Sequence, residues 1–265
     1  MWKLAVMIIR EHNTMTTHSY MKFFFLGLIA FLLTGCTHYY YMPNVQNVPA
    51  FREKNEYRLC GTMGGTDGVN TTELQGAYSV SDNMGLIGNF MAAKGGSDTS
   101  GNWGRGNYYE IGVGYFKPLT DVLTFETYMG AGTGNETHQY SKSGERARLE
   151  LNRFFIQPSL AVSFKYLDVI VSARACKLDF NAITEQGSIP VLQKFNLDTI
   201  SMNPHSFLFE PALTLRTGYK YFKVQLQFQT SSNMDHPNLK LEHGNINLGI
   251  YLSLAPRFKQ KRALN

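Results

Sequence analysis

Asp235 and His236 are adjacent in an Asn-rich stretch, and His138 and His205 stand in two other polar stretches of the chain. An imidazole that is oriented by a carboxylate can act as a general base in hydrolysis. These residues are therefore the candidates for catalysis that the sequence offers. Neighbouring residues of an extended chain point in opposite directions, however, and no second acidic pair stands nearby. The pattern favours polar surface loops, and we predict no catalytic residues and no enzyme activity.

A larger group of charged residues shares one face of stretches that alternate between apolar and polar positions. Near-equal numbers of opposite charges on one confined face favour ion pairing over an ion-selective pore. We predict a charge network in the interior made by the following residues: Arg58, Glu73, Glu110, Glu126, Arg153, Arg174, Glu210, Arg216 and Lys223. Cys60 and Cys176 fall on the same face of stretches that are not neighbours, which predicts free thiols rather than a disulfide.

The sequence has no recognised motif for a cofactor or a metal. It contains no phosphate-binding loop, no paired-cysteine metal pattern and no nucleophile elbow. The run from Gly130 to Gly134 is rich in glycine, but no helical pattern follows it that could orient a phosphate. We expect this run to end a strand and open a loop, and we expect neither a metal nor a cofactor.

The composition indicates which elements position these residues. The chain has 265 residues, of which 17% are charged and 13% are aromatic, with 24 glycines. Low charge and many aromatics exclude a disordered protein, and they favour strands and turns over a helical bundle. The net charge of +5 falls to +3 once the leader described below is removed, and the remaining basic run is a tail at residues 256–265. We therefore expect no nucleic-acid partner.

Apolar and polar residues alternate over stretches of about ten residues, which is the length and period of a tilted membrane-spanning strand. In residues 222–229, for example, every second residue is apolar and the residues between them are Lys or Gln. A helix cannot segregate such a pattern, because its period is 3.6 residues. The pattern predicts strands at residues 56–64, 72–80, 84–93, 107–116, 122–131, 149–164, 169–179, 207–219, 222–229 and 245–254.

The connections between these strands alternate in length. We expect short turns at residues 81–83, 117–121, 165–168 and 220–221, and long loops at residues 65–71, 94–106, 132–148, 181–206 and 230–244. An up-and-down barrel then places the long loops at one end and both chain termini at the other. The predicted fold is all-β, an up-and-down antiparallel transmembrane β-barrel of about ten strands at residues 56–255.

Alternation alone does not decide which face lines the interior, since a soluble lipocalin-like barrel would turn its apolar face inward. Two features favour an outward apolar face. Glycines that suit a narrow lumen crossed by longer side chains lie on the polar face: Gly112, Gly114, Gly130, Gly218 and Gly249. Aromatic residues gather beside the short turns, as in an interfacial girdle: Tyr115, Phe116, Phe164, Tyr166, Tyr219, Tyr221 and Phe222.

An apolar run at residues 23–33 has the length of a signal-peptide core and is too short to span a bilayer as a helix. We predict a signal peptide at residues 1–35, with Met21 as a second candidate start. The run ends in Leu33-Thr34-Gly35-Cys36, which resembles the lipobox of bacterial lipoproteins. The resemblance implies that Cys36 carries diacylglycerol, with palmitate among the acyl chains, and that residues 36–55 form a lipidated linker.

The last predicted strand, at residues 245–254, resembles the β-signal by which assembly machinery recognises outer-membrane barrels, although the chain continues to Asn265. With the lipobox, the mature region resembles the uncharacterised lipidated outer-membrane β-barrel proteins of Gram-negative bacteria. This resemblance implies an outer-membrane location and contacts with outer-membrane lipid and the barrel-assembly machinery. The expected topology, with both termini at the short-turn end, places the lipid anchor at the N-terminus on the periplasmic side.

For the function, we expect a structural role or one carried by contacts of the long loops with an extracellular partner. Three alternatives stay open. The first is a small pore, which requires an open lumen. The second is an outer-membrane enzyme of the ten-stranded barrel type, which requires acidic and histidine side chains to converge at the rim of the long loops. The third is a periplasmic lipocalin-like binding barrel, which requires an apolar cavity and a polar exterior.

Overall fold

The computed structural model describes residues 40–97, 99, 101–140, 144–186, 197–239, 241, 244–256 and 258. The predicted leader, Cys36 and most of the basic tail lie outside these residues. The chain divides into a unit of residues 1–37 and a second unit from His38 to Asn265, and only the second is described below. In that described part, no helix is long and apolar enough to cross a membrane.

Ten long antiparallel strands close into a barrel, as the alternation predicts. The elements are β1 Tyr57–Thr66, β2 Val69–Ser79, β3 Met84–Ser97, β4 Asn102–Pro118, β5 Leu123–Gln139, β6 Arg146–Ser163, β7 Leu167–Gln186, α3 Leu197–Met202, β8 His205–Tyr219, β9 Phe222–Thr230, β10 Ser232–Asn233 and β11 Gly244–Leu254. The two-residue β10 pairs with β8 just beyond the end of β9, so it extends the wall and does not add an eleventh long strand.

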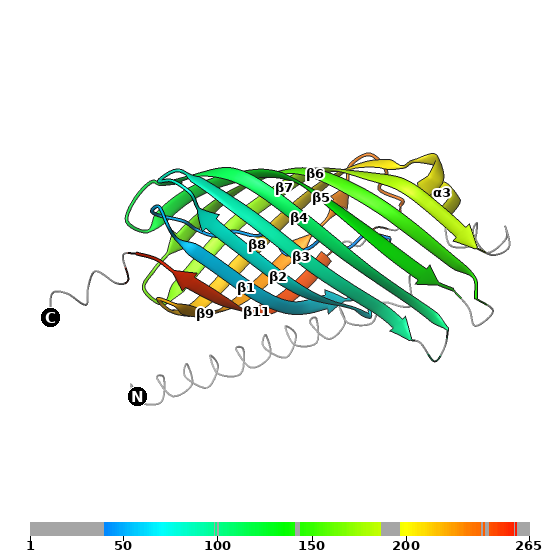
Figure 1. The fold of residues 1–265 in the computed structure, drawn as a ribbon, viewed down its shortest axis with the longest axis horizontal. Helices are drawn as coiled ribbons and strands as arrows, with labels where there is room; N and C mark the ends of the chain where they lie inside the picture. Colours follow the sequence, from blue (N-terminus) through cyan, green and yellow to red (C-terminus); the bar gives the residue numbers. More distant parts are fainter. Residues whose placement is uncertain are drawn as a thin grey trace, which may run out of the picture. The chain divides into compact units, whose positions relative to one another are not determined.

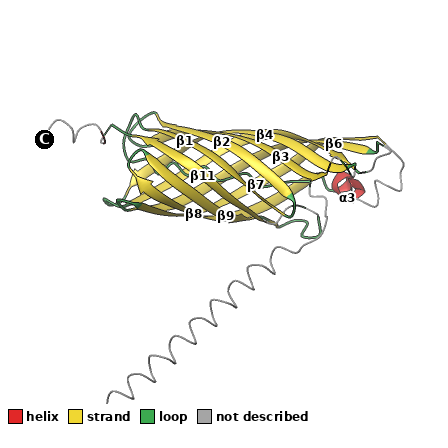
Figure 2. Ribbon diagram, turned by 90° about the horizontal axis from the view of Figure 1, so that it is seen from below, coloured by secondary structure: helices red, strands yellow, loops and turns green. Residues whose placement is uncertain are grey.

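The barrel has up-and-down topology (Figure 1). Each strand from β1 to β8 pairs with the next, and β11 closes the wall by pairing with β1 on one side and β9 on the other. In the closing pair Tyr57 lies opposite Leu254, so the start of β1 and the end of β11 share one rim of the barrel. The described C-terminal residues leave from this rim (Figure 2).

The two rims differ in their connections. The short turns β2–β3, β4–β5, β6–β7 and β8–β9 share a rim with the end of β11, and we call this rim the short-turn end. The opposite rim, the long-loop end, carries the connections β3–β4, β5–β6, β7–β8 and β9–β11. The predicted long loop at residues 65–71 is instead a tight turn, in which Asp67 and Gly68 both have positive φ, 47° and 81°. This conformation is typical of two-residue hairpin turns.

Several strands continue further toward the long-loop end than the sequence predicted, so most of the long loops predicted at residues 94–106 and 132–148 is strand instead, in β3 and β4 and in β5 and β6. The run from Gly130 to Gly134 lies inside β5, so the expectation that it opens a loop is wrong. Here glycine makes room for neighbours: a Cβ added at Gly132 would lie 1.9 Å from the Tyr108 hydroxyl, and one at Gly130 would lie 2.6 Å from the Phe155 ring. The glycines therefore allow bulky side chains from β4 and β6 to fill the lumen beside β5.

The apolar face looks outward and the polar face lines the lumen. In β11, Ile250 has 51% of its surface exposed, whereas the next residue, Tyr251, has 4%. A lipocalin-like barrel with an apolar interior is therefore the wrong description. The predicted aromatic girdle is exposed around the short-turn end, with one exception: Phe116 is buried in the lumen, where its ring packs 5.4 Å from that of Phe51.

Candidate functional site

Residues 40–51, which we call the lumen segment, pass once through the barrel. Tyr40 lies at the long-loop end, where its ring contacts His138 with a centroid separation of 5.0 Å and its hydroxyl lies 3.2 Å from that of Tyr140. Phe51 lies at the short-turn end against Phe116. This part of the predicted linker, residues 36–55, thus lies inside the barrel and fills its lumen. The segment forms neither a strand nor a helix, and it can be buried because side chains of the wall supply hydrogen-bond partners for its backbone.

The polar wall of the barrel binds the backbone of the lumen segment. Every carbonyl oxygen from Pro43 to Pro49 accepts a hydrogen bond of 2.6–3.4 Å from a wall side chain. The donors, in order along the segment, are Gln229 and Asn245 to Pro43, Gln229 to Asn44, Gln75 to Val45, Gln227 to Gln46, Gln157 to Asn47, Arg216 to Val48, and Arg58 and Tyr251 to Pro49. These side chains donate the hydrogen bonds that a neighbouring strand would donate in a sheet. Each bond avoids the cost of leaving a buried carbonyl unpaired, about 1–3 kcal/mol.

Two carboxylates of the wall accept hydrogen bonds from amide groups of the segment. Glu73 accepts from the Val45 amide at 2.9 and 3.1 Å. Glu126 accepts from the Ala50 and Phe51 amides at 2.9 and 2.8 Å. Both carboxyl groups are buried, so these backbone amides replace the hydrogen bonds that the carboxyl oxygens would otherwise make to water. The prediction placed both residues in the charge network without naming their partners, and in the structure both bind the segment.

Ion pairs gather around Arg153 in the middle of the lumen. Its guanidinium pairs with Glu110 and lies 3.9 Å from Glu210, and Arg174 lies 3.6 Å from Glu210. All four side chains are at most 1% exposed. All four residues belong to the predicted charge network, and they come from β4, β6, β7 and β8.

Two residues of the segment bind directly to this cluster. The Tyr41 hydroxyl donates to Glu210 at 2.6 Å and accepts a hydrogen bond from Arg153. The Asn44 side-chain oxygen accepts from Arg153 and, at 2.8 Å, from Arg174. The charge cluster and the segment therefore form one hydrogen-bonded unit, and neither can move without breaking contacts of the other.

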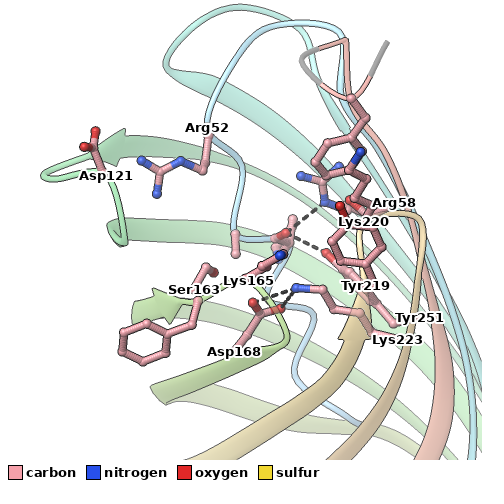
Figure 3. A pocket seen from close by; sticks show the side chains of 15 residues that line it. Arg52, Arg58, Asp121, Ser163, Lys165, Asp168, Tyr219, Lys220, Lys223 and Tyr251 are labelled. Atoms are coloured by element: carbon pink, nitrogen blue, oxygen red, sulfur yellow. Dashed lines mark hydrogen bonds and ion pairs between the residues drawn. The ribbon is translucent and has the colours of Figure 1, made fainter. Parts of the chain in front are cut away.

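At the short-turn end the lumen widens into a cavity of about 640 Å³, which we call the vestibule (Figure 3). There Lys223 donates to both carboxylate oxygens of Asp168 at 2.7 Å, and Arg58 pairs with Glu56. The charged residues that line the vestibule are Arg52, Arg58, Asp121, Lys165, Asp168, Lys220 and Lys223. Cations outnumber carboxylates in this lining, so the vestibule is the basic part of the described lumen.

The middle of the lumen leaves no water-wide passage between the described residues. A channel open to water would expose the atoms that line it. Val45, Gln46 and Val48 of the segment have no exposed surface, and neither do the facing wall residues Arg153 and Gln227. The segment therefore closes the barrel over the part that the structure describes.

All nine residues of the predicted network face the lumen, and Lys223 is the least buried of them. Arg58 and Lys223 pair with Glu56 and Asp168, which the prediction did not include, and Arg216 binds the Val48 carbonyl. The prediction also missed the glutamines that hold the segment. Two of them, Gln227 and Gln229, lie with Gln225 on the polar face of β9, and this cluster was the available signal, because an amide can both donate to and accept from a peptide backbone.

The histidine and acidic residues considered for catalysis have separate roles. His138 contacts Glu136 at 3.2 Å, and His205 contacts Asp179 at 2.7 Å. Asp235 accepts from the Phe207 amide at 2.8 Å. Across the described ranges, no group of three or more His, Cys, Asp or Glu side chains could hold a metal ion. Cys60 and Cys176 are buried free thiols, as predicted.

No family model and no curated protein matches this chain. Among solved structures, similarity is found to the KdgM porin, with 10% identity, a TM-score of 0.36 and coverage of 76% of this chain and 99% of that one. It is also found to the outer membrane protease OmpT from Escherichia coli, with 7% identity, a TM-score of 0.40 and coverage of 80% and 99%. The attachment invasion locus protein Ail of Yersinia pestis shows 11% identity, a TM-score of 0.34 and coverage of 76% and 99%. Similarity at this level carries no argument about what this chain binds or does.

Proposed function

We propose that the protein is an outer-membrane β-barrel lipoprotein whose lumen is closed by its own N-terminal segment. Its role is then structural, or carried by contacts of the long loops with a partner outside the cell, without transport and without catalysis. The observation that supports a closed barrel is the unbroken series of wall hydrogen bonds to the carbonyls from Pro43 to Pro49. Such a series is typical of a built-in structural element.

Insertion in a membrane is supported by the apolar exterior. Outward side chains such as Ile111, Leu248 and Ile250 are half or more exposed. In water this apolar surface would cause aggregation, whereas in a bilayer it contacts the acyl chains of the lipid. Ile250→Arg should therefore cost about 2–4 kcal/mol of unfolding free energy in lipid vesicles, measured by urea titration. Asn70→Arg, an outward position beside the tight β1–β2 turn, should be nearly neutral.

The membrane assignment is overturned if the protein without its leader, with Cys36→Ala, is a folded monomer in buffer without detergent. It is also overturned if Ile250→Arg and Asn70→Arg have the same effect in vesicles. In water, a cation at position 250 would replace an exposed apolar side chain and would not be penalised.

Lipidation is supported by the lipobox ending at Cys36. Labelled palmitate should be incorporated into the unmodified protein and not into Cys36→Ala. Cys60→Ala and Cys176→Ala are matched controls, since both thiols are buried in the lumen, and both variants should keep the label. Equal labelling of Cys36→Ala and the unmodified protein would contradict the proposal.

Closure of the lumen is tested by conductance. The purified full chain in a planar bilayer should show no steady current, because the middle of the lumen leaves no path for hydrated ions. Replacing residues 41–49 by Gly and Ser removes the side chains and prolines that fill the lumen, and it should produce channels in any protein that still assembles. Stable, ion-selective channels from the unmodified protein would contradict closure and favour the pore alternative.

A further inference from the structure

We propose that the mature N-terminus emerges at the long-loop end of the barrel, on the opposite side of the membrane from the C-terminus. The lipid on Cys36 would then insert into the outer leaflet at the cell surface, and not into the periplasmic leaflet that the sequence alone suggested. This inference rests on the proposed function, which supplies the membrane and the lipid. Its partner is a lipid surface beside the barrel's own long-loop rim.

The direction of the segment follows from its contacts, taken in order. Tyr40 contacts His138 and Tyr140, at the end of β5 that leads into the β5–β6 loop. Ala50 and Phe51 bind Glu126, near the start of the same strand. Because both ends of the segment are placed against one strand, their order along the barrel does not depend on strand tilt or register.

The following residues continue the same path. Arg52 donates to the carbonyl of Thr120 in the β4–β5 turn at 2.7 Å, and Asn55 bonds to Ser79 at the end of β2. The chain then enters β1 at Tyr57, opposite Leu254. The segment therefore enters at the long-loop end, crosses the lumen and joins the wall at the short-turn end, from which the C-terminal residues also leave.

The distance from Tyr40 to Cys36 decides where the lipid can reach. Cys36 precedes Tyr40 by four residues. A fully extended chain spans about 3.5 Å per residue, so a tether of four residues reaches at most about 14 Å from Tyr40. The hydrocarbon core of a bilayer is about 30 Å thick. A tether of this length cannot bring an acyl chain from the long-loop end to the leaflet at the short-turn end.

The segment cannot slide to relax this constraint. Tyr41 and Asn44 are hydrogen-bonded to the Arg153 cluster, and Glu126 holds the amides of Ala50 and Phe51. A shift by one residue would misalign the whole series of carbonyl contacts. The lumen around Val45 and Val48 also has no room for an acyl chain, so the strands must close around the segment while the lipid is already on the long-loop side.

The test places the same short protease site at three positions of the full-length, lipidated chain. The first follows His38, between the lipid and Tyr40. The second follows Gly144 in the β5–β6 connection, where a side chain would meet open space. The third follows Asn265, at the C-terminus. Protease is added to intact cells and, in parallel, to cells with a permeabilised outer membrane, and palmitate label is followed together with the barrel band.

We expect cleavage at the first and second sites in intact cells, and at the third only after permeabilisation. Cleavage at the first site should separate the palmitate label from the barrel while the label stays with the cells. The inference is overturned if the Gly144 site is cut in intact cells and the site after His38 is cut only after permeabilisation. If the Gly144 site itself needs permeabilisation, the proposed orientation in the outer membrane fails, and surface display fails with it. If instead the site after His38 needs permeabilisation and the Gly144 site does not, the proposed outer-membrane orientation stands and only the proposed path of the segment fails.

Discussion

The middle of the lumen and the vestibule at the short-turn end both hold opposite charges, and they hold them differently. Around Arg153 the side chains are at most 1% exposed and share their hydrogen bonds with the lumen segment. In the vestibule, Lys223 and Asp168 form a pair whose side chains are 12% and 4% exposed, beside a cavity of about 640 Å³. Both regions hold ion pairs, but only in the middle, where the segment is hydrogen-bonded to the charge cluster, is the lumen closed to water.

This contrast has an energetic reason. Buried ions have lost their hydration, so removing one partner leaves the other charge without compensation. A pair beside a cavity can recover water when its partner is lost, and salt can screen it. The middle of the lumen should therefore respond strongly to substitutions, and the vestibule should respond weakly.

The largest effect is expected at Arg153. Arg153→Met leaves Glu110 and Glu210 facing a reduced positive charge in a dry environment and removes hydrogen bonds to Tyr41 and Asn44. We expect a loss of about 3–5 kcal/mol in unfolding free energy, measured by urea titration in lipid vesicles, or a failure to assemble.

The matched control lies on the same strand. Arg148 forms a pair with Glu150 at 3.3 Å, and the two side chains are 60% and 51% exposed. Arg148→Met should cost less than about 1 kcal/mol. Equal effects of the two substitutions would mean that the central cluster contributes no more than a surface pair.

A smaller effect is expected at Glu126, where the segment leaves the dry part of the lumen. Glu126→Gln keeps the shape of the side chain but replaces one acceptor oxygen by a donor, so one of the two amides at Ala50 and Phe51 loses its partner. We expect a loss of about 1–3 kcal/mol and faster hydrogen exchange at these amides. Glu150→Gln, an exposed change, is the control. Unchanged exchange at Ala50 and Phe51 would show that Glu126 does not hold the segment.

In the vestibule, Lys223→Met removes the partner of Asp168. Because the cavity lets water reach the carboxylate, we expect a loss of only about 1 kcal/mol, and this loss should shrink as salt is raised. The loss for Arg153→Met should not depend on salt. A salt-independent loss of several kcal/mol at Lys223 would remove the distinction between the two regions.

The smallest effect is expected at Ala50, which has a φ of 53° where the chain turns from the lumen toward β1. A non-glycine residue is strained in this conformation, so Ala50→Gly should raise the unfolding free energy by about 0.5 kcal/mol. Ala77→Gly, in the regular strand β2, should lower it by about 0.5–1 kcal/mol. If both variants are destabilised alike, the turn at Ala50 stores no strain.

Much of the fold was predictable because it depends on local pattern. The alternation in residues 222–229 and 245–254 separates an apolar from a polar face with a period of two, and in the structure the apolar face is outward and the polar face is inward. The charged residues of the polar face were found in this way, since any inward residue of a closed barrel must enter the lumen. Strand ends at the long-loop side were predicted less well, because glycines inside β5 resemble a loop when the side chains of Tyr108 and Phe155 are not known.

The sequence by itself determined the strands and their apolar and polar faces, because alternation relates residues two positions apart on one strand. The glycines of the polar face and the aromatic residues beside the short turns then favoured an outward apolar face. Only the tertiary structure decided what the polar side chains of the interior bind. The contacts that fill it join residues far apart in the chain, such as Gln229 and Pro43, which are separated by 186 positions. The segment from Tyr40 to Phe51 has no strand or helix period, so no local signal distinguishes it from a linker. Its position becomes defined only when ten strands close around it and present hydrogen-bond donors to each of its carbonyls from Pro43 to Pro49.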